Sequence, residues 1–220
     1  MNPNTNALLH ILYTSHIRGD LDLLPRLHTF LKQMKSAPLD EDEDVMICAV
    51  EPVVRRTLLL DLGEACAPEV WHCLATGGRS VLIGLDAMGY AAANVTGLLT
   101  SEARVRLGDN LMGMALVDEE HPWQDDDLVV TARQDEPSLP MLLQISLTAT
   151  ETTRLDGNRL RLASVQSGQV GIAHISRAGS NPVVRAAGIF DLPRTTPPDP
   201  TIAGTVDFIM SEARLYRQRS

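Results

Sequence analysis

The stretch LLHILYTSHIRGDLDLLPRLHTFL, residues 8–31, decides the fold, because it joins a buried strand, a polar loop and an amphipathic helix. Its first part, Leu8–Tyr13, is a short apolar run that ends in small and polar residues, which is typical of a buried strand leading into a loop. After the loop, Asp22 suits a helix N-cap and Pro25 stands in the first helical turn. The apolar residues that recur on one face of this helix are Leu24, Leu27, Leu31 and Met34.

The rest of the chain mixes helical and strand patterns. The acidic segment Asp40–Asp44 predicts a solvated loop, because like charges at that density repel one another. Apolar spacing predicts a helix over 78–89, with Gly89 placed to end it, and a closing amphipathic helix over 200–217. The predicted strands are 45–50, 57–62, 91–95, 128–132, 141–148, 160–165, 170–176 and 183–190. Helices between early strands, followed by a β-rich second half, indicate an α/β (α+β) domain built from layered sheets.

Composition and charge restrict the class of protein. The 220 residues, 44% of them hydrophobic, predict a single domain over 1–220 with a flexible N-terminus over 1–7. The 28 acidic and 19 basic side chains give a net charge of -9, which opposes binding to nucleic acid or to an anionic membrane. We find no secretory signal and no apolar run of membrane-spanning length, and three cysteines, an odd number, fit a reducing compartment. We therefore expect a cytoplasmic protein.

Four segments resemble, in order and spacing, the catalytic domain of 5'-nucleotidase-type metallophosphoesterases, within the calcineurin-like phosphoesterase superfamily. The opening LYTSHIRGDL (12–21), followed by LPRL (24–27), is similar to the family's strand, Thr-Asn-Asp-Ile-His-Gly loop and Leu-Pro-Arg-Leu helix. The other similar segments are 58–65, 86–97, and 168–175 with 198–200. This resemblance implies a four-layer α-β-β-α sandwich in which helices flank two mixed β-sheets. It also implies that the family's C-terminal nucleotidase domain is missing from this chain.

The metal-binding residues of the family are replaced in this sequence. In the family, aspartates, histidines and an asparagine hold two divalent metals, which make a nucleophile from bound water. Here His16 stands in place of the first aspartate, Arg18 in place of a histidine, and Glu64 in place of the bridging aspartate. Gly97 and Leu98 stand where the asparagine and histidine of Gly-Asn-His-Glu are expected. Because arginine cannot lose its proton to ligate a metal, the resemblance implies the fold without the two-metal centre.

Two further acidic residues belong to the same degenerate positions. Asp20 lies in the first loop, and Asp20 or Glu64 could pair with the cations there. Asp61 ends a predicted strand, and we interpret it as a capping residue rather than an acid or base. We therefore predict a catalytically inactive domain without a cofactor, retained as a binding, assembly or regulatory module for a protein partner or a second copy of the chain.

Two other functions stay open at this point. A divergent phosphoesterase or 5'-nucleotidase could hold manganese, iron or zinc through Glu64, His16 and further residues. Alternatively, His16 and Arg18 could form an anion site, in which fixed positive charge replaces the metals and binds a phosphate, a nucleotide or another small anion.

Three other motifs have simpler interpretations. Cys66 and Cys73, with His72, lack the paired spacing of a structural zinc site, and we interpret them as buried thiols. The acidic run Asp125–Asp127 lacks the glycine and distal glutamate of a calcium loop, and predicts a solvated turn. Gly77 and Gly78 precede a predicted helix and indicate a helix-entry turn.

Overall fold

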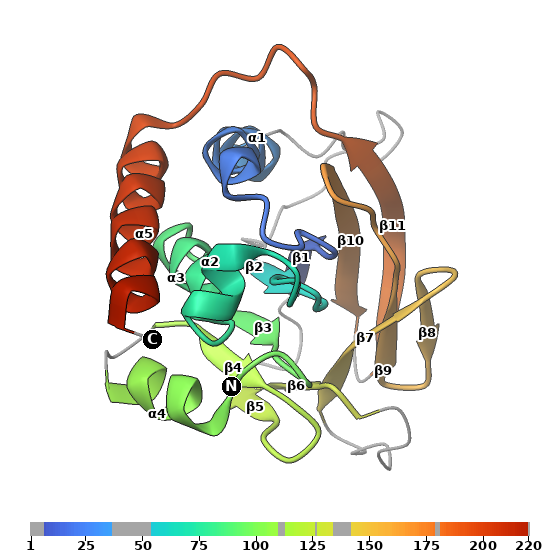
Figure 1. Cartoon of the computed structure of the whole chain (residues 1–220). Helices are drawn as coiled ribbons and strands as arrows, with labels where there is room; N and C mark the ends of the chain where they lie inside the picture. Colours follow the sequence, from blue (N-terminus) through green and yellow to red (C-terminus); the bar gives the residue numbers. More distant parts are fainter. Residues whose placement is uncertain are drawn as a thin grey trace.

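The computed structural model describes residues 7–36, 54–109, 113–125, 127–133, 142–178 and 181–219, and these form two β-sheets with associated helices (Figure 1). The six-stranded sheet has the order β11-β10-β1-β2-β3-β4, and the five-stranded sheet has the order β5-β6-β7-β9-β8. Both sheets are mixed: β1 is parallel to β2 and antiparallel to β10, and β6 is parallel to β7 and antiparallel to β5.

The strands of the six-stranded sheet are β1 (Ala7–Thr14), β2 (Val54–Asp61), β3 (Ala92–Asn94), β4 (Ala115–Val117), β10 (Gln169–Ala178) and β11 (Asn181–Asp191). Those of the five-stranded sheet are β5 (Trp123–Asp125), β6 (Leu128–Thr131), β7 (Leu143–Thr150), β8 (Arg154–Asp156) and β9 (Arg159–Ala163). The helices are the 3-10 helix η1 (Leu21–Leu23), α1 (Leu24–Ser36), α2 (Trp71–Ala75), α3 (Arg79–Ala87), α4 (Ser101–Asp109) and α5 (Pro200–Arg219).

Alternating side chains of β1 and β2 divide the core into two layers. In β1, Leu12 packs into the cluster beneath the helices, whereas Ile11 and Tyr13 pack into the cluster shared with the five-stranded sheet. The same alternation repeats over residues 58–60 of β2. Successive side chains of a strand point to opposite faces, so each central strand contributes to both cores. The prediction of two mixed sheets flanked by helices is confirmed.

The helices lie along the outer face of the six-stranded sheet, where α5 contacts α1, α2 and α3 (Figure 1). Gly84 allows a close helix contact, because a Cβ at this position would lie 2.6 Å from Leu24 Cδ1. Among the described residues, no helix combines the length and the apolar character required to cross a bilayer.

Several sequence predictions need correction. The aspartate that caps the first helical segment is Asp20, whose Oδ1 accepts a hydrogen bond of 3.1 Å from the Leu23 amide; Asp22 lies inside η1. The predicted helix over 78–89 is α3, and the helix over 200–217 is α5, whereas α2 and α4 were not predicted. The acidic segment Asp40–Asp44 and the predicted strand 45–50 lie outside the described residues. So do residues 1–6 of the predicted flexible N-terminus, while residue 7 already belongs to β1.

Candidate functional site

The candidate site is formed by loops that follow three neighbouring parallel strands. Because β1, β2 and β3 run in parallel, the loops after them leave the same edge of the sheet. In α/β folds this edge, at the carboxyl ends of the strands, is the usual place for ligands. The first two loops are joined directly: the amides of His16, Arg18 and Gly19 donate to the carbonyl oxygens of residues 63, 64 and 65, at 3.0, 2.9 and 2.9 Å.

Three non-glycine residues of these loops have left-handed backbone conformations. Their φ angles are 55° at His16, 53° at Arg18 and 55° at Glu64. For residues with a Cβ this region costs roughly 1–2 kcal/mol each. The main-chain hydrogen bonds between the loops offset this cost, so pairing between the loops fixes the backbone at three of the predicted ligand positions.

The structure brings His16 and Glu64 together. His16 Nε2 lies 3.5 Å from Glu64 Oε1. On the other side of the ring, His16 Nδ1 lies 3.0 Å from the Val165 carbonyl oxygen and 2.8 Å from Ser15 Oγ. Because a carbonyl oxygen only accepts, Nδ1 carries a hydrogen, and Nε2 is the nitrogen directed at Glu64. The Glu64 side chain is 60% exposed, so this pair faces solvent.

Arg18 and Asp20 do not join this pair. Arg18 Nη2 lies 3.1 Å from Glu69 Oε1, and both side chains are exposed. Glu69, rather than the predicted Asp20 or Glu64, is therefore the carboxylate beside Arg18, while Asp20 caps η1. An exposed ion pair contributes about 0–1 kcal/mol, and an anion at Arg18 would have to compete with Glu69. The interpretation of His16 and Arg18 as an anion site stays a prediction.

Asp61 is enclosed at the end of β2. Its side chain is fully buried; Oδ2 accepts a hydrogen bond of 3.0 Å from Thr14 Oγ1, and Oδ1 accepts one of 3.0 Å from the Gly63 amide. Thr14 Oγ1 also lies 3.0 Å from the Tyr90 hydroxyl oxygen. Burial raises the pKa of Asp61 to about 7, and the two hydrogen bonds oppose this increase. Asp61 thus has the geometry of a residue that caps the end of a strand.

The third loop contributes an asparagine that the sequence analysis did not single out. Asn94 ends β3; its Nδ2 donates to the Leu62 carbonyl oxygen at 3.1 Å, and its Oδ1 accepts from the Thr96 amide at 3.0 Å. Gly97 and Leu98 follow in a turn, where Gly97 has a φ of 68°. A polar side chain directly after a buried strand was the signal that could have identified Asn94. Its amide is used to join loops of the protein.

The family that the sequence resembles holds two metals at these loops, and the residues at the corresponding positions here have other charges and other hydrogen-bond partners. Both carboxyl oxygens of Asp61 already accept hydrogen bonds from the protein. Arg18 puts a permanent positive charge at a ligand position. Within the described ranges, no group of three or more His, Cys, Asp or Glu side chains is arranged to hold a metal ion.

The other motifs have definite structural surroundings. Cys66, His72 and Cys73 lie in one buried cluster around Ser80, a residue that the sequence analysis missed. Asp125 and Asp127, from the predicted solvated turn, both pair with Arg56. The predicted helix-entry turn at 77–78 does precede α3.

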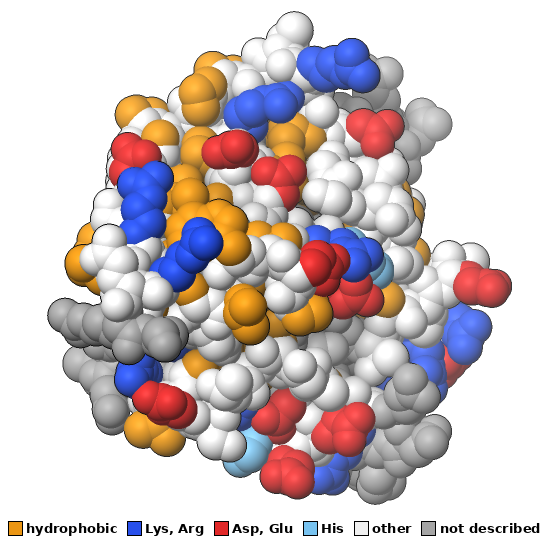
Figure 2. Space-filling model, viewed as in Figure 1, with side chains coloured by type: hydrophobic (Ala, Val, Ile, Leu, Met, Phe, Trp, Pro, Cys, Tyr) orange, Lys and Arg blue, Asp and Glu red, His pale blue; other side chains and the backbone are white. Residues whose placement is uncertain are grey.

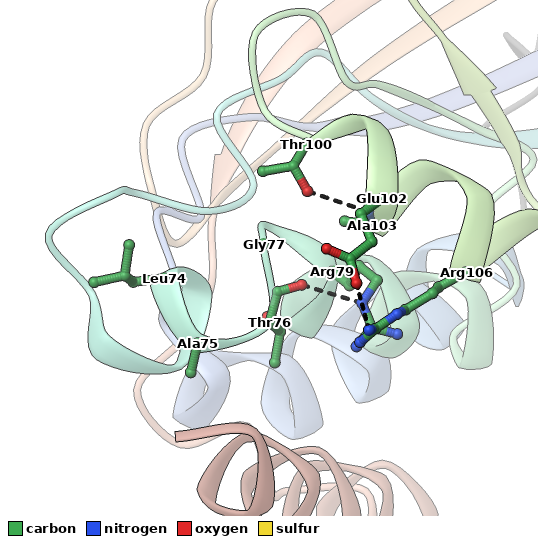
Figure 3. Close-up of a pocket in the computed structure, with 9 residues that line it drawn as sticks. All are labelled: Leu74, Ala75, Thr76, Gly77, Arg79, Thr100, Glu102, Ala103 and Arg106. Carbon is green, nitrogen blue, oxygen red and sulfur yellow. Dashed lines mark hydrogen bonds and ion pairs between the residues drawn. The ribbon is translucent and has the colours of Figure 1, made fainter. Parts of the chain in front are cut away.

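A polar cavity of about 210 Å³ lies between α2, the start of α3 and α4 (Figure 3). The Arg79 side chain on its wall is buried; Nε donates to the Thr76 carbonyl oxygen at 3.1 Å, and Nη2 lies 3.5 Å from Glu212 Oε1. Arg106, on α4, pairs with Glu102 one turn away. Both cations therefore already have carboxylate partners, and the cavity carries little positive charge for a ligand.

The structure combines two mixed sheets, helices along the outer face of the six-stranded sheet, and loops gathered at the carboxyl ends of the parallel strands. In a comparison of structures, the chain is similar to the NAD nucleotidase NadN of Haemophilus influenzae, with a TM-score of 0.54 and 8% sequence identity. The match covers 96% of this chain and 61% of the nucleotidase, so the chain spans less than two thirds of that protein. At this identity the similarity shows the fold alone.

A second similar structure is the calcineurin-like phosphoesterase YfkN of Bacillus subtilis, with a TM-score of 0.45 and 10% identity, over 96% of this chain and 99% of that one. No protein-family model matches this chain, and no curated protein matches its sequence.

Proposed function

We propose that this chain is a phosphoesterase-fold domain that does not hydrolyse phosphate esters with two metals, and that it acts as a binding or assembly module. The main support is that the polar side chains at the carboxyl ends of β1 and β2 already have partners within the protein. Asp61 is buried and bonded within the protein, Arg18 is paired with Glu69, and His16 faces Glu64. Two-metal hydrolysis needs several oxygen and imidazole ligands that converge on open space, and these loops offer one solvent-facing pair.

The surface supports a protein partner or a second copy of this chain. Hydrophobic side chains gather on the face of the molecule that carries α2 and α5 (Figure 2). Three large side chains of these helices are mostly exposed: Leu74 at 73%, Phe208 at 62% and Leu215 at 54%. Apolar side chains that collect on one face are a common mark of a protein interface.

The decisive experiment measures metal and turnover together. We expect purified protein to contain no stoichiometric manganese, iron or zinc, and to leave p-nitrophenyl phosphate, nucleotides and NAD intact when manganese is added. Light scattering after size-exclusion chromatography should show self-association if the partner is a second copy, and Leu74→Ser with Phe208→Ser should then weaken it. Turnover that depends on an added metal would contradict the proposal.

The rival function is a divergent metal-dependent phosphoesterase, and one observation favours it. His16 Nε2 and Glu64 Oε1 lie 3.5 Å apart, on the side of the loops open to solvent, where a single ion could join them. In that case turnover with manganese should disappear in Glu64→Ala and persist in Glu69→Ala. Glu69 provides a matched control because it is an exposed carboxylate next to the same loops.

A further inference from the structure

A second cavity, of about 250 Å³, lies beside the one in Figure 3 and shares Leu74, Gly77 and Thr100 with it. It is a mainly apolar cavity, and two cysteines, Cys66 and Cys73, contribute to its wall. These side chains are only 6% and 3% exposed, so the cavity is their route to small molecules.

The two thiols lie close together although they come from different elements. Cys66 belongs to the loop after β2, and Cys73 belongs to α2. Ser80 Oγ lies 3.3 Å from Cys66 Sγ and 3.6 Å from Cys73 Sγ, so both sulfurs contact the same hydroxyl oxygen. Two sulfurs that contact one oxygen atom are neighbours, and a disulfide bond between them requires their side chains to rotate toward each other.

A proton acceptor completes the cluster. His72 Nε2 lies 3.0 Å from the Gly19 carbonyl oxygen and must donate to it, so the neutral ring leaves Nδ1 as an acceptor. Nδ1 lies 2.9 Å from Ser80 Oγ, and burial lowers the pKa of His72, which keeps the ring neutral. A thiol proton can therefore pass to Ser80 Oγ while the serine proton passes to His72.

The cluster also distinguishes its two sulfurs. The interaction with the Cys66 thiol, together with the Ala67 amide, lowers the pKa of Cys73 against the effect of burial. The same interaction, together with burial, raises the pKa of Cys66. We therefore assign the first attack to Cys73, because the thiolate is the reactive form of cysteine.

We propose that Cys66 and Cys73 form a redox-active dithiol that exchanges with small molecular disulfides entering this cavity. The Cys73 thiolate attacks one sulfur of the small disulfide, which forms a mixed disulfide and releases one thiolate that takes a proton from solvent. Cys66 then passes its proton through Ser80 to His72, and its thiolate attacks Cys73 Sγ. The second small thiolate leaves Cys73 and takes the proton from His72. The two cysteines are oxidised to a disulfide, and the small disulfide is reduced to two thiols.

The test follows the cysteines in the native chain. Protein is incubated with reduced and oxidised glutathione in several ratios, quenched with acid, alkylated and digested with trypsin. Cys66 and Cys73 fall on one peptide, 57–79, and Cys48 falls on another, 36–55, which serves as an internal control. In oxidised buffer, peptide 57–79 should become two hydrogens lighter without retaining glutathione.

Single variants test the order of the steps. Cys66→Ser should accumulate glutathione on Cys73, whereas Cys73→Ser should form its adduct on Cys66 at least about tenfold more slowly. Ser80→Ala keeps both thiols and should slow closure of the disulfide. Circular dichroism checks that each variant is folded. If both thiols of the folded wild-type chain stay reduced while urea-unfolded chain oxidises, the dithiol proposal is wrong; equal adduct rates in the two cysteine variants would overturn the order of attack.

Discussion

Asp61→Asn should remove a specific pH dependence from the stability of this protein. In the unfolded chain the carboxyl has its ordinary pKa of 3.8, and burial raises the pKa to about 7 in the folded protein. Between these pH values the folded state holds more protons, so the contribution of Asp61 to the free energy of unfolding decreases as pH rises. A pKa shift of this size lowers the contribution of Asp61 to the free energy of unfolding by about 4 kcal/mol between pH 4 and pH 7. Outside that window the contribution stays constant.

The measurement is urea unfolding of the wild type and Asp61→Asn at several pH values from 4 to 8, analysed as a difference. The difference is needed because His10 titrates in the opposite sense. Burial, with smaller contributions from His174 and Lys35, lowers the pKa of His10 to about 4, so its contribution to stability is lost as the pH falls below about 6.5. Wild type minus variant should therefore fall by about 4 kcal/mol from pH 4 to pH 7.

A difference that stays constant over this range would refute the reasoning, and one that rises with pH would show that Asp61 is held in its charged form. The same pair of proteins also tests the proposed function. If manganese stabilises the wild type at pH 8 and leaves the variant unchanged, then the Asp61 carboxylate binds metal, contrary to our proposal.

Three other substitutions test the packing. Gly171→Ala should cost about 2–3 kcal/mol in thermal or urea unfolding, because its Cβ would lie 2.0 Å from the Tyr13 ring; a neutral effect would mean that this ring can move. Gly204→Ala, in the interior of α5 with nothing within 4 Å of the new Cβ, should instead stabilise by up to about 1 kcal/mol. Arg79→Ala should cost about 2–4 kcal/mol, because it removes a buried cation that lies 3.5 Å from Glu212. A loss below about 0.5 kcal/mol would show that Arg79 contributes little to the packing of α3 against α5.

The sequence predicts the order of strands and helices best where an apolar pattern is long enough to show its period. The segment 8–31 combines a continuous apolar run in β1, whose residues 10–14 are all buried, with a helical repeat in α1, and the structure contains both. The predicted cap was wrong because a 3-10 turn precedes α1, and its start depends on backbone geometry rather than on an apolar repeat. α2 was missed because it has only five residues, too few for a helical period, and it packs against α5, which is distant in sequence.

The sequence was sufficient to predict where the candidate site lies, but it predicted fewer of the side-chain contacts within the site. Parallel strands bring their carboxyl ends to one edge, which is why loops far apart in the sequence meet around His16 and Glu64. The partner of Arg18 was not predictable, because Glu69 lies 51 residues further along the chain and reaches Arg18 only through the loop conformation. The contact between Ser80 and His72 likewise depends on the direction in which α3 begins after the turn at Gly78.

The shape of the loops at this edge has a consequence for protein engineering. The left-handed residues of these loops are held by hydrogen bonds from the amides of one loop to the carbonyl groups of the other. The backbone conformation of the loops therefore requires no bound ion. A designer who reinstates ligands with His16→Asp, Arg18→His and Leu98→His would begin with much of the scaffold already preorganised. The effort would then go into reopening space around Asp61 rather than into rebuilding the main chain.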